Sequence, residues 1–232
     1  MLESLDARAA GRYEFIPLGS NCDVSHWLRK RNFRQNAYPF DWNVTPLASA
    51  CDLLESDFAA FFEPENLVCL DPVPRLLFDE GDATVLKVSE EIITPVVCRR
   101  HGMLFPHDFS KAGGAEFPVI REKYARRIAR FREALAPSSG KTPAFIAVNA
   151  PLNAWQEEKY RMAGVAAPDM SPGRFQEDMA RLRAVLAARI GGPFVVATLD
   201  EAMAALPERS GWMAGVRRRF TDFLKGGNQD GH

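Results

Sequence analysis

The sequence predicts a mixed α/β fold of the α+β kind, and three observations predict it. Short apolar runs of strand length recur along the chain, amphipathic segments lie between them, and Gly, Pro or acidic breaks separate the two kinds of segment. With 232 residues, 47% of them apolar, the chain can bury a substantial core. No repeat or low-complexity linker divides it. We therefore expect a single domain over residues 1–232 with a helix–strand–helix C-terminal portion.

The first part of the chain predicts a strand and two helices. An apolar run at residues 15–18 breaks at Gly-Ser-Asn, and an amphipathic helix follows over residues 22–33. Apolar residues recur again at helical spacing over residues 46–62, which predicts the second helix. Asp41 or Asn43 is placed to cap that second helix.

The middle and last parts of the chain differ in pattern. Residues 66–109 predict strands and loops, because apolar runs are separated by acidic, Pro or Gly breaks. These runs lie at residues 67–70, 76–78, 84–86 and 92–97. Beyond them, helices are expected at residues 117–135, 175–190 and 212–223, strands at residues 144–148 and 194–199, and a flexible tail at residues 226–232.

Charge and cysteine content limit the classes of function. The 29 Lys plus Arg nearly balance the 30 Asp plus Glu, so no global field favours nucleic acid or an acidic membrane surface as a partner. No segment has the length and apolarity of a membrane span or a secretory leader. Four cysteines are too sparse for a disulfide framework in a chain of this size. We expect a cytoplasmic protein.

Cys22 is the candidate nucleophile, because it opens a helix directly after a strand. Unpaired N–H groups and the positive end of the helix dipole stabilise a thiolate there, so a depressed thiol pKa is expected. Its neighbours are polar or turn-forming, whereas Cys51, Cys69 and Cys98 stand in apolar runs and are expected to be buried. Asn21 either donates its amide to an oxyanion, beside the Cys22 N–H, or fixes the turn.

A cysteine nucleophile needs a base, and His107 is the favoured candidate. It ends an apolar run within Phe-Pro-His-Asp, so a separate strand carries the imidazole to the thiol. His26 lies four residues after Cys22 on the same helical face, but it reaches back along the first turn. His101 and His232 are the remaining histidines.

Three residues are candidates for the group that orients the imidazole. Asp41 lies between two aromatic residues and is expected to be half-buried, but it is equally suited to cap a helix or to pair with Arg29 or Arg31. Asp108 is adjacent to His107, and on a strand its side chain points to the opposite face. Asn149 follows the next apolar strand.

Other chemistry has weaker support in the sequence. A basic run over residues 121–132 is typical of the solvated face of an amphipathic helix, with an anion-binding ridge as the alternative. By residue type, Cys22, His26, Cys98 and His101 could form a Cys₂His₂ zinc site, but the sequence contains no Cys-x-x-Cys knuckle. No phosphate loop, dinucleotide fingerprint or Gly-x-Ser-x-Gly elbow is present. We therefore expect no cofactor and no metal.

Several motifs in order carry a resemblance to a known family. Leu-Gly-Ser-Asn-Cys at residues 18–22, Tyr-Pro-Phe-Asp-Trp at 38–42 and Phe-Pro-His-Asp-Phe at 105–109 resemble the bacterial "putative papain-like cysteine peptidase" family. The resemblance covers roughly the first 135 residues. It implies a papain-like α/β arrangement, with a cysteine at a helix N-terminus facing a histidine on the sheet, and a single domain of that type.

These observations together predict a papain-like cysteine hydrolase or acyltransferase. His107 deprotonates Cys22, the thiolate attacks an amide or thioester carbonyl of a peptide or acyl substrate, and water or an amine resolves the thioester. Ser20, Trp42 and Asp108 join Asn21 as candidates for oxyanion or substrate binding, and Asp41 for the orienting role. The alternatives are a catalytically silent papain-like binding module and a zinc-stabilised interaction domain.

Overall fold

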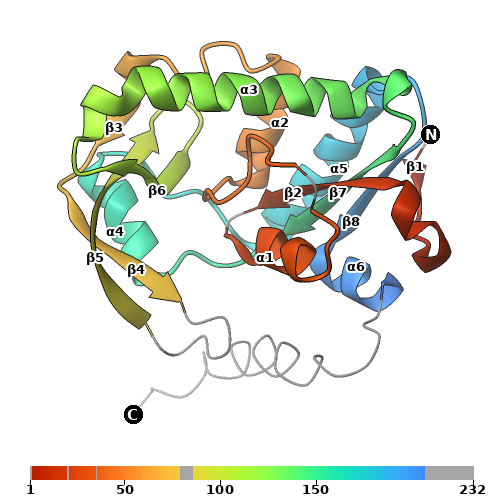
Figure 1. Cartoon of the computed structure of the whole chain (residues 1–232), viewed down its shortest axis with the longest axis horizontal. Helices are drawn as coiled ribbons and strands as arrows, with labels where there is room; N and C mark the ends of the chain where they lie inside the picture. The colour runs from red at the N-terminus through yellow and green to blue at the C-terminus, as the bar shows by residue number, and fades with distance from the viewer. Residues whose placement is uncertain (1, 20, 35, 79–85, 207–232) are drawn as a thin grey trace.

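Two four-stranded sheets and six α-helices make up the described part of the protein. The computed structural model describes residues 2–19, 21–34, 36–78 and 86–206 (Figure 1). The strands are β1 Leu2–Glu3, β2 Tyr13–Gly19, β3 Leu67–Cys69, β4 Val73–Phe78, β5 Leu86–Cys98, β6 Met103–Ser110, β7 Thr142–Val148 and β8 Phe194–Thr198. The α-helices are α1 Asp23–Lys30, α2 Leu47–Glu55, α3 Phe117–Leu135, α4 Ala154–Met162, α5 Pro172–Arg189 and α6 Leu199–Ala205.

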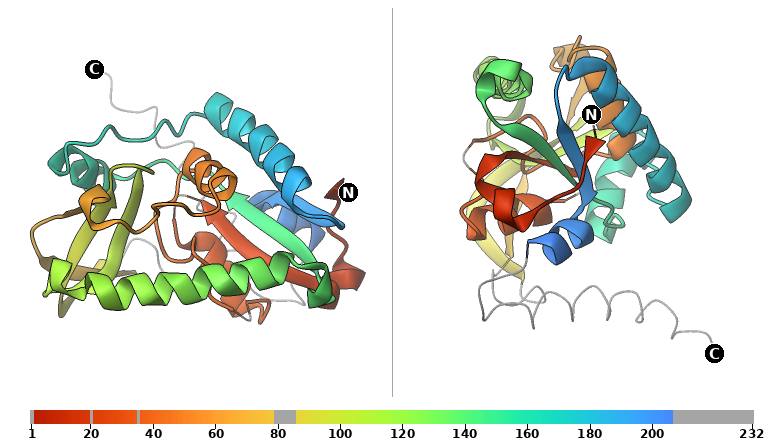
Figure 2. Two further views of the ribbon diagram at one scale, coloured as in Figure 1. Left: turned by 90° about the horizontal axis from the view of Figure 1, so that it is seen from above. Right: turned by 90° about the vertical axis from the view of Figure 1, so that its right-hand side faces the viewer.

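The first sheet is parallel, in the order β1-β8-β7-β2. Successive residues of β2 and β7 enter two different cores, because side chains alternate across a strand. Helices α1 and α6 cover one face, whereas α2 and α5 lie on the other (Figure 2). Burial on both faces explains why these strands are continuous apolar runs in the sequence.

The second sheet is antiparallel and is organised around β5. Strands β3 and β4 pair with successive parts of β5, and β6 pairs with residues 93–98. The ladder between β5 and β6 is interrupted: Thr94 pairs with Phe109 and Val96 pairs with Phe105. The three β6 residues Pro106–Asp108 therefore lie opposite a single residue of β5, Pro95, and form a β-bulge.

Helix α3 packs on both sheets and joins their cores (Figure 1). Tyr124 stacks on Phe62 with ring centroids 5.1 Å apart and contacts Phe105 of β6 edge-on. Two turns further along, Phe131 contacts Phe145 of β7. The amphipathic repeat predicted over residues 117–135 is thus confirmed, and its apolar side spans the junction between the sheets.

The predicted second helix is too long. Helix α2 ends at Glu55 rather than at residue 62, because Asp57, Phe58 and Ala60 adopt positive φ angles that an α-helix does not contain. Phe58 is buried although it lies in the turn after the helix. The helical spacing of apolar residues therefore extends past the end of the helix itself. The N-cap of α2 is Pro46, without a side-chain cap, so the capping role expected of Asp41 or Asn43 was wrong.

Other expectations have mixed outcomes. The mixed α/β fold, the strand runs expected at residues 67–70, 76–78 and 92–97, and the elements now labelled β7, α5 and β8 are confirmed. Of the run expected at residues 84–86, only Leu86 lies within the described residues, as the first residue of β5. Helices α4 and α6 were not predicted. The helix expected at residues 212–223 and the tail at 226–232 lie outside the described residues. None of the helices in the described ranges combines the length and apolarity needed to cross a membrane.

Candidate functional site

Cys22 lies at the N-cap of α1, three residues after the end of β2, as the sequence predicted. The chain can turn there because Gly19 has a φ of +135°. A Cβ on Gly19 would lie 2.5 Å from the Val148 carbonyl oxygen, so only glycine lets β2 end so close to β7. The Cys22 side chain is half-buried and makes no capping hydrogen bond.

The other three cysteines do not all share one environment. Cys51 and Cys98 have no exposed surface, as expected. Cys69 is exposed, so its predicted burial was wrong. The reason is that β3 has only three residues and its last position points out of the core.

The thiol of Cys22 is held in its protonated form. Burial raises its pKa to about 12, and the carboxylates of Asp23, Asp41 and Asp108 add to the effect. The expectation of a depressed pKa was therefore wrong. Desolvation and three nearby negative charges both oppose a thiolate, and the short helix α1 does not compensate for them.

Asn21 is engaged with its neighbour. Its Nδ2 donates to Asp23 Oδ2 at 2.6 Å, and its Oδ1 accepts from the Asp23 backbone N–H at 3.1 Å. This is a local turn closed by a side chain, so of the two roles considered the geometry favours turn formation. Ser20 lies outside the described residues.

His107 lies in the β6 bulge and is half-buried. Burial lowers its pKa; Asp108 acts in the opposite direction, and Arg75 and Lys123 lower the pKa further. The imidazole is therefore neutral at pH 7, the form that can accept a proton. No hydrogen bond joins it to Cys22 in the described part of the chain, while Asp108 lies within electrostatic range of both groups.

His26 and His101 have different surroundings. The rings of His26 and Trp42 are perpendicular, with centroids 4.8 Å apart, and Trp42 has a φ of +68°. His101 is buried, its Nε2 has no hydrogen-bond partner among the described residues, and burial lowers its pKa. The zinc set proposed from spacing is not assembled, because no three His, Cys, Asp or Glu side chains among the described residues form a metal-binding group.

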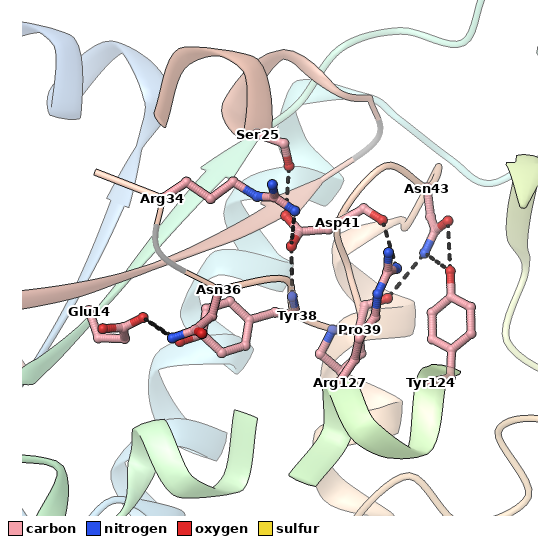
Figure 3. A network of polar contacts seen from close by, with 10 residues as sticks. All are labelled: Glu14, Ser25, Arg34, Asn36, Tyr38, Pro39, Asp41, Asn43, Tyr124 and Arg127. Atoms are coloured by element: carbon pink, nitrogen blue, oxygen red, sulfur yellow. Dashed lines mark hydrogen bonds and ion pairs between the residues drawn. The ribbon is translucent and has the colours of Figure 1, made fainter. Parts of the chain in front are cut away.

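Asp41 is completely buried and is the centre of a polar network (Figure 3). Its carboxylate accepts hydrogen bonds from Ser25 Oγ at 2.8 Å, the Tyr38 backbone N–H at 2.6 Å and Arg34 Nη2 at 3.0 Å. None of these donors is an imidazole, and the ion-pair partner is Arg34 rather than Arg29 or Arg31. The network ties α1 to the loop that precedes α2.

Asp108 is held by helix α3. Lys123 Nζ approaches its Oδ1 at 2.6 Å, and the Tyr124 hydroxyl donates to its Oδ2. Asn43 in turn donates to the Tyr124 oxygen at 2.9 Å and to the Pro39 carbonyl at 3.1 Å (Figure 3). A chain of hydrogen bonds therefore links the loop before α2 to the β6 bulge.

Asn149 follows β7, and its amide donates to the Met170 carbonyl at 3.0 Å. Two adjoining cavities of about 240 and 220 Å³ lie beside it, and both are lined by Asn149 and Phe175. One cavity is bounded by the start of α2 and the other by the end of β8. They lie at the carboxyl edge of the parallel sheet, where ligands of such sheets commonly bind.

The basic run on α3 is largely neutralised. Four of its members pair with acidic side chains: Arg121 with Glu63, Lys123 with Asp108, Arg126 with Glu122 and Arg132 with Asp57. These pairs favour a solvated helix face over an anion-binding ridge.

Fold and site together define a mixed α/β protein with one half-buried thiol at the start of a helix. The chain belongs to the family described as "Putative papain-like cysteine peptidase (DUF1796)", whose model matches residues 13–161. The match extends beyond the region of the predicted resemblance and includes Cys22, Asp41, His107 and Asn149. No curated protein and no solved structure matches the chain.

Proposed function

We propose that the protein is a cysteine-dependent hydrolase or acyltransferase acting on an amide or thioester, with Cys22 as nucleophile and His107 as base. The observation that carries the proposal is the position of Cys22, a half-buried thiol at the N-cap of α1 in a chain of a cysteine peptidase family. The neutral imidazole of His107 and the position of Asp108 near both groups support it.

The protonation states indicate how the reaction would start. A raised thiol pKa and a lowered imidazole pKa leave a neutral pair at rest rather than a thiolate–imidazolium pair. His107 therefore takes the thiol proton as sulfur bonds to the carbonyl carbon and the carbonyl electron pair moves to oxygen. The Cys22 backbone N–H donates to that oxyanion, while Asn21 holds the turn that presents this N–H.

Collapse of the tetrahedral intermediate re-forms the carbonyl and breaks the bond to the leaving group. The imidazolium returns its proton to the departing amine or thiolate. Water or an amine then attacks the Cys22 thioester, again with His107 as base, and restores the thiol. Hydrolysis and acyl transfer differ only in which nucleophile enters at this step.

Electrostatics favour Asp108 as the group that stabilises the imidazolium, because its charge raises the pKa of His107 against the opposing effect of burial. Its oxygens accept hydrogen bonds from Lys123 and Tyr124, so it acts on His107 through its charge. In this proposal Asp41 positions α1 against the loop that precedes α2. Trp42, beside His26, borders the substrate.

A catalytically silent binding module is the second candidate, and one observation favours it. A thiol whose pKa is raised to about 12 has almost no thiolate at pH 7 unless a base assists it. A silent member of the family would keep the fold and the buried Asp41 network but not the coupling between Cys22 and His107.

Alkylation of Cys22 tests the proposal. A Cys69→Ser background removes the exposed competing thiol, and iodoacetamide labelling is followed by peptide mass spectrometry from pH 5 to 10. We expect His107→Ala to slow labelling at pH 7 at least about ten-fold, because general-base assistance contributes 10²–10⁴-fold in enzymes. The matched control His101→Ala should change little. If His107→Ala alkylates like the parent, the silent module is favoured.

A further inference from the structure

The bulge in β6 is the feature that places His107. Strand pairing fixes Phe105 and Phe109 on either side of it, and both side chains are fully buried. The three residues between them have no pairing partner on β5, so contacts with other elements must fix the conformation of the bulge. Bulges of this kind re-aim side chains next to active sites.

Asp108 is the residue of the bulge that is anchored, and its side chain is only 5% exposed. Its two partners on α3 differ in rigidity. The Lys123 side chain is 31% exposed at the end of a flexible stem, whereas Tyr124 is 1% exposed and packs between Phe62 and Phe105. Tyr124 is therefore the contact that fixes Asp108 in one place.

The Tyr124 hydroxyl has one proton and two acceptors in reach, Asp108 Oδ2 and Asn43 Oδ1. The carboxylate is the stronger acceptor, so the proton goes to Asp108 while the phenol oxygen accepts from Asn43 Nδ2. Asn43 is itself held at the Pro39 carbonyl. Each member of the chain thus has a defined direction of donation.

We propose that Tyr124 is a positioning residue of the Cys22 site: its hydroxyl holds Asp108, and through Asp108 it holds the β6 bulge in the conformation that presents His107 to the thiol. This inference rests on the proposed function, because it concerns the base of that reaction. Among the described residues the Tyr124 hydroxyl hydrogen-bonds to Asp108 and Asn43 and to neither Cys22 nor His107, so its effect on the reaction would pass through Asp108.

Tyr124→Phe tests the inference because it removes one oxygen and keeps the ring in the core. Tyr160→Phe is the matched control, since Tyr160 is also fully buried and its hydroxyl makes one hydrogen bond, to the Gly102 carbonyl at 2.8 Å, away from the bulge. Both variants are made in the Cys69→Ser background. The melting temperature and the pH dependence of Cys22 alkylation are measured for each.

We expect both variants to lose similar thermal stability but to differ in the alkylation profile. Tyr124→Phe should slow labelling at pH 7 by about ten-fold or more, since small misplacements of a catalytic group cost this much, and should remove the inflection contributed by His107. Tyr160→Phe should retain both. A Tyr124→Phe profile that keeps the inflection and a rate within about two-fold of the parent overturns the inference.

Asp108→Ala supplies a second route, because it breaks the same hydrogen bond from the other side. It should reproduce the loss, and adding Tyr124→Phe to Asp108→Ala should have no further effect if the two residues act as one unit. An additive further loss, or an Asp108→Ala profile like that of the parent, overturns the inference. If His107→Ala itself has no effect, the proposed function fails first, and that outcome is distinct.

Discussion

Two opposing effects at Cys22 can be ranked by magnitude. A charge at a helix terminus gains about 0.3–1 kcal/mol, which corresponds to less than one pKa unit. Burial and three carboxylates instead raise the pKa of this thiol to about 12 from an ordinary value of 9.0. The sequence showed the helix start but not the desolvation, because Asp41 and Asp108 reach Cys22 from segments 19 and 86 residues away.

Asp23→Asn should make Cys22 more reactive. Asp23 contributes the largest electrostatic part of the raised pKa after burial, and its side chain is exposed, so the fold tolerates an amide there. We expect alkylation of Cys22 at pH 8 to accelerate about two- to five-fold, the size of an exposed charge interaction. The control Asp200→Asn removes an exposed carboxylate elsewhere. Equal rates in the three proteins would contradict the electrostatic account.

At the scale of elements, local patterns predicted most of the fold. The strand–turn–helix at β2 and α1, the strands of the second sheet and helix α3 all have a clear period in the sequence and were confirmed. Helices α4 and α6 are short, with nine and seven residues, so an apolar period has little length over which to appear. A signal for them did exist: Asn153 with Gln156, and Thr198 with Glu201, form capping boxes at their N-termini.

The end of β2 depends on one glycine. Gly19→Ala forces a Cβ to within 2.5 Å of the Val148 carbonyl oxygen, at a φ that L-residues rarely adopt. We expect a loss of about 2–4 kcal/mol in the free energy of unfolding by urea denaturation. Gly140→Ala is the matched control, because Gly140 also has positive φ but has open space around it. It should cost about 1 kcal/mol. Equal losses would show that close approach to β7 is unimportant.

Asp41→Asn tests whether the buried network is structural or catalytic. An amide cannot accept from Ser25, Tyr38 and Arg34 as the carboxylate does, and it leaves the Arg34 charge without its partner. We expect a loss of about 2–4 kcal/mol of stability. The rate of Cys22 alkylation, measured on the same preparation at a temperature where the protein is folded, should stay within about three-fold of the parent. A much larger loss of rate with little loss of stability would instead assign Asp41 to the imidazole.

At the scale of the whole molecule, the sequence lacks information about which distant segments meet. The pairing of β2 with β7 joins residues about 130 positions apart, and nothing in either apolar run specifies that partner. The candidate site likewise depends on contacts between segments that are far apart in the sequence. Cys22 and His107 are identifiable from local motifs, whereas the link from Asn43 through Tyr124 to Asp108 exists only after three separate segments have folded together.

Stability of the whole molecule should fall in alkaline solution. Burial raises the pKa of Cys22 and Cys51 to about 12 and also raises the pKa values of Cys98, Tyr38, Tyr124 and Tyr160. In the unfolded chain thiols ionise near pH 8.5 and phenols near pH 10. Above those values the unfolded state loses protons that the folded state keeps. The stabilisation is therefore complete below about pH 8 and is lost as pH rises towards the folded pKa values.

Urea unfolding at intervals from pH 7 to 11 measures this loss. Each such group adds a slope of about 1.4 kcal/mol per pH unit once its unfolded form is ionised, so the free energy of unfolding should fall progressively more steeply above pH 8.5. Cys51→Ala removes one of these groups from the core and should make the fall between pH 9 and 11 shallower by about one such slope, although the variant starts from lower stability. A free energy of unfolding that is constant from pH 8 to 10.5 would contradict burial of these thiols and phenols as protonated groups.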